Sequence, residues 1–238
     1  MSIGKAFKGW FGEAVISVAK KIALDGDIYR EVNNVTLPTS NGTTQIDHII
    51  VSRYGIFVLE TKNMEGWIFG SENQPKWTQS FRRSRFQFQN PLHQNYRHIK
   101  ALEEFLGLPT EMFHSVVCFV GETCELKTQM PANVTRGGPF GYIKSKQTVL
   151  LPDEQVSEIV EAIKSGMRPK GFLGLTTAET KREHLASLKE RHESTTTCPK
   201  CSSELVLRTV KRGERTGKSF YGCSKFPSCR YMRDAEAA

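Results

Sequence analysis

The segment IDHIIVSRYGIFVLETKN, residues 46–63, constrains the fold more than any other part of the chain. Two apolar runs flank a short turn, which is the pattern of a β-hairpin. Side chains alternate between the two faces of a strand. One face would hold Ile49, Val51, Ile56 and Val58, and the other Ile46, Ile50, Phe57 and Leu59. Both faces are apolar, so we expect a central hairpin that is covered on both sides.

Three charged residues, Asp47, Glu60 and Lys62, interrupt this apolar hairpin. A two-residue loop that starts at Arg53 places Asp47 opposite Glu60. A loop that starts one residue later places Asp47 opposite Lys62. In either register, the period of two puts all three charged side chains on one face, at one end of the hairpin. His48 then points to the opposite face, where we expect it to be structural.

Carboxylates that face each other on neighbouring strands repel, and burial makes the pair more costly unless a cation neutralises it. A divalent ion such as Mg²⁺ binds one or two carboxylates and fills its other positions with water and phosphate oxygens. A lysine beside such a site would stabilise charge on the phosphate. This set favours metal-assisted hydrolysis of phosphodiester bonds. The alternative is a salt bridge between Asp47 and Lys62 at the rim of the sheet, with Glu60 in solvent.

Four of the six cysteines lie near the end of the chain, in the spacing Cys198-x2-Cys201 and Cys223-x5-Cys229. Two cysteine pairs at this separation are typical of a ribbon around one tetrahedral Zn²⁺. A segment of ~40 residues has too little core to fold without such a staple. We therefore predict a structural zinc site.

The net charge of +8 is unevenly distributed, because residues 168–233 hold 15 Lys and Arg against 6 Glu. A basic segment of this kind favours a polyanion such as DNA, or is simply a solvated surface. No apolar run approaches the ~18 residues of a membrane span. Residues 1–26 predict an amphipathic helix rather than a signal peptide, with docking on a membrane surface as an alternative. We expect a cytoplasmic protein.

The predicted elements follow the order helix, strands, helix, strand, helix, which is typical of a single α/β domain. We expect this domain over residues 1–170, a charged helical linker over 171–195 and the zinc ribbon over 196–238. Strands are predicted near 29–38, as an aromatic-rich pair within 66–89 with a turn at 73–75, over 112–122 and near 148–151. Helices are predicted over 90–107, between the cap Asn90 and the stop Gly107, and over 151–166.

The motifs around the hairpin resemble the nuclease-related domain, NERD, which is grouped with the PD-(D/E)xK nucleases. The resemblance rests on Gly12-Glu13, on QIDHIIVSRYGIFVLETKN and on NPLHQ, and it covers roughly residues 8–125. It implies a restriction-endonuclease-like mixed sheet flanked by helices. The catalytic residues that it implies are Glu13, Asp47, Glu60, Lys62 and Gln94, of which Asp47 and Glu60 would bind Mg²⁺ or Mn²⁺. Glu13 would be a carboxylate added from the N-terminal helix.

Arginines and phenylalanines are interleaved in FRRSRFQFQ, residues 81–89. Arg82, Arg83 and Arg85 would contact phosphates while the rings stack on bases. The alternative is that the rings belong to the core and the arginines lie outside.

The segment 196–233 resembles the C-terminal zinc finger of type IA DNA topoisomerases, because it contains SFYGCSKFPSC. It departs from that pattern at Ser202, where a glycine often follows the second cysteine. The resemblance implies binding to DNA, chiefly single-stranded. The candidate DNA-binding residues are Arg208, Lys211, Arg212, Arg215, Lys218, Phe220, Tyr221, Phe226 and Tyr231. The alternative for the aromatic residues is packing in the small core of the ribbon.

The sequence thus predicts a metal-dependent DNA endonuclease whose zinc ribbon holds the DNA. The alternative is a non-catalytic DNA-binding or adaptor protein with a nuclease-like fold. The sequence identifies no protein partner.

Overall fold

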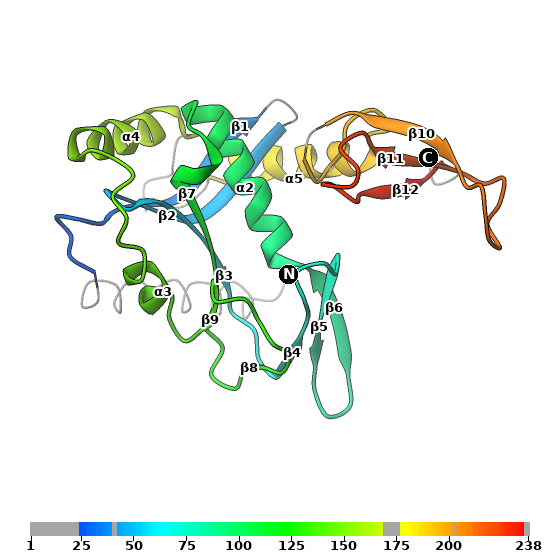
Figure 1. Cartoon of the computed structure of the whole chain (residues 1–238), viewed down its shortest axis with the longest axis horizontal. Helices are drawn as coiled ribbons and strands as arrows, with labels where there is room; N and C mark the ends of the chain where they lie inside the picture. The colour runs from blue at the N-terminus through cyan, green and yellow to red at the C-terminus, as the bar shows by residue number, and fades with distance from the viewer. Residues whose placement is uncertain (1–23, 40–41, 169–176, 202, 236–238) are drawn as a thin grey trace. The chain divides into compact units, whose positions relative to one another are not determined.

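The computed structural model describes residues 24–39, 42–168, 177–201 and 203–235 (Figure 1). The chain divides into two compact units, Met1–Val35 with Gln45–Met167, and Thr36–Thr44 with Arg168–Ala238. The predicted N-terminal amphipathic helix and Glu13 lie outside the described residues. Within the described ranges, no helix is both long and apolar enough to cross a membrane.

The first unit holds most of a five-stranded mixed sheet in the order β1-β2-β3-β7-β9, whereas residues 36–39 and 42–44, which end β1 and begin β2, belong to the second unit. Its strands are β1 (Arg30–Thr39), β2 (Gly42–Ser52), β3 (Gly55–Lys62), β7 (Phe113–Phe119) and β9 (Val134–Arg136). β2 and β3 are antiparallel, whereas β3, β7 and β9 are parallel. The predicted mixed α/β class is confirmed.

The β2–β3 hairpin has the first of the two predicted registers. Ser52 pairs with Gly55, which leaves Arg53 and Tyr54 as the loop, and His48 pairs with Leu59. Gly55 has a φ of 113°, a conformation that side chains disfavour. Continuing the register by one residue brings Asp47 opposite Glu60.

The central hairpin is covered on both faces, as the two apolar patterns predict. One face packs into a buried cluster with α3 (Phe140–Lys144), formed by Leu24, Tyr29, Ile50, Phe57, Leu59, Val116, Cys118 and Ile143. The other face carries α2 (Pro91–Leu106). Asn95 of α2 is fully buried and donates its amide to the carbonyls of Val58 and Val116, at 2.7 and 3.2 Å. These two hydrogen bonds fix the helix on the sheet.

The ends of α2 are those that the sequence predicts. The Asn90 side chain accepts a hydrogen bond from the Leu92 N–H, and Pro91 occupies the first helical position. Gly107 ends the helix in the left-handed conformation, with φ 65°. The Asn90 amide also donates to three carbonyls of the preceding turn, so this residue joins the helix to the segment before it.

The aromatic-rich segment forms more strands than the predicted pair. β4 (Trp67–Phe69), β5 (Lys76–Ser80) and β6 (Arg85–Gln89) join β8 (Glu125–Leu126) in a four-stranded sheet ordered β6-β5-β4-β8. The chain turns a second time between β5 and β6, where Phe81 N–H donates to the Ser84 carbonyl. Trp77 and Phe119 stack in the buried cluster beneath this sheet, with ring centroids 6.1 Å apart.

The remaining elements of this unit are a short 3-10 helix, Thr110–Met112, and α4 (Asp153–Gly166). Val156, Ile159, Val160 and Ile163 form the buried face of α4, as predicted. The predicted strand near 148–151 is wrong. The N–H groups of Leu150 and Leu151 both donate to the Arg53 carbonyl, so this segment is held by the hairpin loop and not by a strand ladder.

In the second unit, the charged segment forms α5 (Ala178–Glu193). This helix contacts the start of β2 within the same unit, where Thr43 Oγ1 lies 2.9 Å from His184 Nδ1 and 3.2 Å from Ser187 Oγ. The buried Arg191 donates to the Thr43 carbonyl at 2.8 Å. The last element is an antiparallel sheet of β10 (Leu205–Thr209), β11 (Ser219–Cys223) and β12 (Met232–Asp234).

Candidate active site and zinc ribbon

Asp47, Glu60 and Lys62 occupy the end of the β2–β3 hairpin on the face that α2 covers. Glu60 is 3% exposed, whereas Asp47 and Lys62 are half-buried. Asp47 accepts a hydrogen bond from the Thr61 N–H at 3.3 Å. The hairpin thus turns the two carboxylates toward the same region, because residues that lie opposite each other on neighbouring strands project from the same face.

Lys62 pairs with Glu60 and not with Asp47. Its ammonium lies 2.6 Å from Glu60 Oε1 and donates to Gln94 Oε1 at 3.0 Å. The alternative prediction of a rim salt bridge between Asp47 and Lys62 is therefore wrong. Its second part, that Glu60 lies in solvent, is also wrong. Gln94 reaches the cluster because it lies in the second turn of α2, on the side that faces the sheet.

His98 is a member of the cluster that the sequence reasoning missed. Its Nε2 lies 3.4 Å from Glu60 Oε2, and its side chain is 9% exposed. The spacing from Gln94 is four residues, so both side chains project from the same face of α2. This four-residue spacing was the feature of the sequence that could have identified His98 as a neighbour of the cluster. His48, in contrast, lies on the opposite face with Nδ1 2.7 Å from Asn33 Oδ1.

The negative charges of Asp47 and Glu60 are stabilised to different extents by neighbouring groups. Burial, and after it the nearby charge of Glu60, raise the pKa of Asp47 to about 6, although the hydrogen bond from Thr61 acts to lower it. Burial also acts to raise the pKa of Glu60, but His98 and Lys62 outweigh it and the pKa of Glu60 is lowered. Asp47 is thus the acid whose charge a bound cation would relieve most.

The chemistry of this donor set fits a hard divalent cation, since Mg²⁺ needs only one or two protein carboxylates. Asp47 and Glu60 supply such a pair. Among the described residues, they do not belong to any group of three His, Cys, Asp or Glu side chains close enough to share one ion. Glu13, the third predicted carboxylate, lies outside those residues.

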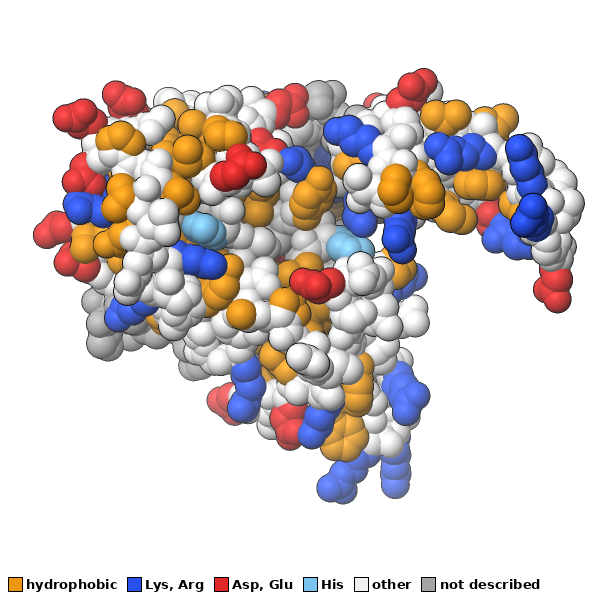
Figure 2. Space-filling model, viewed as in Figure 1, with side chains coloured by type: hydrophobic (Ala, Val, Ile, Leu, Met, Phe, Trp, Pro, Cys, Tyr) orange, Lys and Arg blue, Asp and Glu red, His pale blue; other side chains and the backbone are white. Residues whose placement is uncertain are grey.

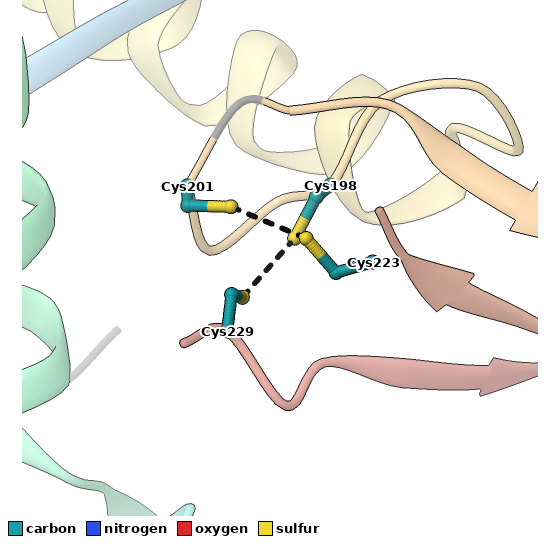
Figure 3. Close-up of side chains that lie close together, drawn as sticks. All are labelled: Cys198, Cys201, Cys223 and Cys229. Carbon is teal, nitrogen blue, oxygen red and sulfur yellow. Dashed lines mark hydrogen bonds between the residues drawn. The ribbon is translucent and has the colours of Figure 1, made fainter. Parts of the chain in front are cut away.

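The four predicted zinc ligands converge at the base of the ribbon. Cys198, Cys201, Cys223 and Cys229 place their sulfurs within 4.8 Å of one another (Figure 3). The Sγ atoms of Cys198 and Cys229 are 3.8 Å apart, and those of Cys201 and Cys223 are 3.4 Å apart. Tetrahedral zinc with Zn–S bonds of ~2.3 Å requires sulfurs ~3.8 Å apart. The set therefore suits a structural Zn²⁺.

The aromatic residues of the ribbon divide between core and surface. Tyr221 and Tyr231 pack against the cysteine cluster, and Phe220 is half-buried across from Arg208. Phe226 is 59% exposed. Core packing thus accounts for the two tyrosines.

All five basic candidates of the ribbon, Arg208, Lys211, Arg212, Arg215 and Lys218, are exposed. Arg215 forms an ion pair with Asp234. Three exposed apolar side chains in the same sheet, Val206, Leu207 and Met232, carried no signal in the sequence beyond their strand positions.

The β5–β6 hairpin also divides its side chains. Phe88 contacts Trp77 edge-on and belongs to the core. Phe86 is 56% exposed and meets Phe81 edge-on, at 6.3 Å. Arg82, Arg83 and Arg85 are exposed. The structure does not bring these arginines into the Asp47 and Glu60 cluster through any described contact.

Comparison with known proteins defines the class. Residues 8–120 match the family model of the nuclease-related domain, and residues 195–238 match that of the topoisomerase DNA binding C4 zinc finger. The chain therefore contains a NERD domain followed by a topoisomerase-type zinc ribbon, as both resemblances predicted. The two matched segments are thus similar to nuclease-related domains and to a zinc finger that is described as DNA binding.

Three relatives share parts of the chain. An uncharacterized protein of Bacillus anthracis is 52% identical over 97 residues, which are 40% of this chain and 46% of the relative. DNA topoisomerase 1 of Helicobacter pylori is 32% identical over 60 residues, 25% of this chain and 8% of the topoisomerase. The uncharacterized protein YrdD of Escherichia coli is 44% identical over 41 residues, 17% and 20% of the two chains. The matched segments thus span less than half of each relative.

Proposed function

We propose that the protein is a metal-dependent nuclease that hydrolyses phosphodiester bonds in DNA, with its zinc ribbon holding the DNA. The observation that carries this proposal is the gathering of Asp47, Glu60 and Lys62 at one end of a rigid hairpin under α2. The restriction-endonuclease-like architecture and the PD-(D/E)xK assignment belong to the same proposal.

Asp47 and Glu60 would hold Mg²⁺ or Mn²⁺. When bound, such an ion supplies positive charge to the phosphate that is attacked. Lys62 would keep its ammonium beside the reacting phosphate, held there by Glu60 and by Gln94. His98 would orient Glu60 from the helix side, because it contacts the carboxylate oxygen that Lys62 does not. Glu13 would add a third carboxylate.

In this proposal, the zinc ribbon binds DNA and the domain that contains the hairpin cleaves it. The exposed basic residues of the ribbon would bind DNA phosphates in the cytoplasm and so raise the local DNA concentration for the catalytic domain. Removal of the chain after residue 194 should then weaken DNA binding while leaving the hairpin residues in place.

The test is cleavage of plasmid DNA and of circular single-stranded DNA by the purified protein in Mg²⁺ or Mn²⁺. Asp47→Asn, Glu60→Gln and Lys62→Met should each lower cleavage by at least ~100-fold, as loss of a group that stabilises transition-state charge does. Glu158→Gln on the exposed surface of α4 is the matched control and should cut normally. Cleavage that is equal in all variants refutes the site. DNA binding without cleavage by the unaltered protein supports the non-catalytic alternative instead.

A further inference from the structure

The outward face of the four-stranded sheet carries aromatic side chains that the catalytic proposal does not use. Trp67 and Phe69 are each 38% exposed, on either side of the fully buried Ile68. Phe81, in the turn after β5, is also 38% exposed. These rings and the turn residues 82–85 line a hollow of about 440 Å³. Apolar side chains that gather into one exposed patch often mark an interaction site, so three rings at one hollow favour a binding surface.

The spacing of the rings suits stacked bases. A strand rises ~3.4 Å per residue, so Trp67 and Phe69 project from the same face ~7 Å apart. This is about twice the ~3.4 Å rise of a nucleic-acid strand. Sheets that bind single strands use aromatic side chains on their open face in this manner.

The charge around the rings is positive. Arg85 lies on the same face, because it pairs with Ser80 and Ser80 pairs with Trp67. Within the described part of the chain, no carboxylate forms an ion pair with Arg82, Arg83 or Arg85. Lys127 lies over the Trp67 ring at 5.6 Å, although Glu125 offsets its charge. Figure 2 shows basic and hydrophobic side chains gathered toward the bottom of the view, over the β5–β6 hairpin.

The same face is close to the proposed catalytic cluster along the chain. Lys62 ends β3, and Trp67 begins β4 five residues later. Five residues span at most ~18 Å even when fully extended. At ~3.4 Å per nucleotide, this distance corresponds to about five nucleotides. A strand that is bound at one place therefore reaches the other without a long loop.

We propose that this surface, formed by Trp67, Phe69, Phe81, Arg82, Arg83 and Arg85, binds an unpaired DNA strand within about five nucleotides of the phosphate that is cut. The aromatic rings stack on the bases and the arginines contact phosphates, a combination that is typical of single-strand binding. A duplex binds less well, because its bases are already stacked on one another. The position relative to the cut rests on the proposed function, whereas the binding itself does not.

The test uses the full-length protein, a ten-nucleotide oligothymidylate and no added Mg²⁺, so that nothing is cleaved. A base stacked on Trp67 quenches its fluorescence. Trp67→Phe should keep the affinity within about threefold, because a ring remains, but lose most of the quenching. Trp67→Ala combined with Phe69→Ala should weaken binding at least ~5-fold, the lower end for one stacked base. Tyr96→Ala, which removes a 44% exposed ring from α2, is the control and should bind normally.

A second variant tests the charge without touching a ring. Replacing Arg82, Arg83 and Arg85 together by glutamine should lower the slope of log affinity against log salt by about 2, since each single-strand phosphate contact contributes ~0.7. These are exposed positions, so this variant should fold even if the aromatic variant does not. Unchanged affinity and salt slope in all variants would overturn the proposal.

Two further outcomes are distinguishable. If anionic vesicles bind and the same variants weaken only that binding, the surface is a membrane-docking face and the proposal is wrong. If the oligonucleotide binds as expected but no metal supports cleavage, the nuclease proposal fails and the stacking surface stands. If every surface variant cleaves single-stranded DNA normally, the nuclease proposal stands and the stacking surface is not used in cleavage.

Discussion

Replacing Asp47 by asparagine should make the metal-free protein more stable at neutral pH. The half-buried side chain of Asp47 lies beside Glu60, and desolvation together with the Glu60 charge raises its pKa from 3.8 to about 6. Between these two values the folded protein holds a proton that the unfolded chain has released. Stability therefore falls as the pH rises through this window, and it stays low above it.

The magnitude follows from the shift. A change of about 2 pKa units corresponds to ~3 kcal/mol, which is the upper limit of the gain from Asp47→Asn at pH 8. At pH 4 the gain should vanish, because the carboxyl group is then protonated. Glu60→Gln should have the opposite sign at pH 8, since the pKa of Glu60 is lowered by His98 and Lys62 and its charge is stabilising.

The assay is urea-induced unfolding at pH 4, 6 and 8, followed by circular dichroism, with and without Mg²⁺. An ion present at 100 times its dissociation constant should add ~2.7 kcal/mol to the unaltered protein and little to Asp47→Asn. A difference between the two proteins that does not change with pH would refute the argument that Asp47 is held in a repulsive site. The same conclusion would follow if Asp47→Asn were less stable at pH 8.

Three other predictions follow from single contacts. Stripping zinc with a chelator should unfold the ribbon and release the metal to a colorimetric dye, because metal binding contributes ~10–16 kcal/mol to the folding of such sites, and Cys223→Ser should bind no zinc. Asn95→Ala should destabilise the protein by ~2–4 kcal/mol in urea unfolding, since it leaves the buried carbonyls of Val58 and Val116 without their amide donor; Asn73→Ala, in an exposed turn, should have no effect. Gly121→Ala should cost ~1–3 kcal/mol in the same assay, because the added Cβ would overlap the Met64 carbonyl oxygen.

In the central hairpin, the alternation of side chains and the type of turn were enough to predict part of the structure. Its two apolar faces, and the convergence of Asp47, Glu60 and Lys62, follow from a period of two that is independent of the rest of the chain. The period of two does not decide whether Lys62 pairs with Asp47 or with Glu60. From α2, His98 contacts Glu60 and Gln94 accepts a hydrogen bond from Lys62, and these contacts hold the lysine beside Glu60.

Segments whose structure depends on a distant partner were harder to predict. Residues 148–151 are apolar enough for a strand, but their backbone groups are taken by the Arg53 carbonyl from the hairpin loop. Trp67 and Phe69 alternate as core residues would, yet they lie on the open face of their sheet. The zinc ligands needed no such context, because their spacing alone defines the ribbon. The assignment of catalytic roles stays a prediction.

The contacts of Thr43 with α5 also affect the order in which the chain completes its structure during synthesis. Thr43 bonds to His184, Ser187 and Arg191, which follow it by 141 to 148 residues. A ribosome that adds ~5–20 residues per second needs roughly 7–30 s to make that stretch. Thr43, near the start of β2, therefore has no helical partner until about four fifths of these 238 residues have been made.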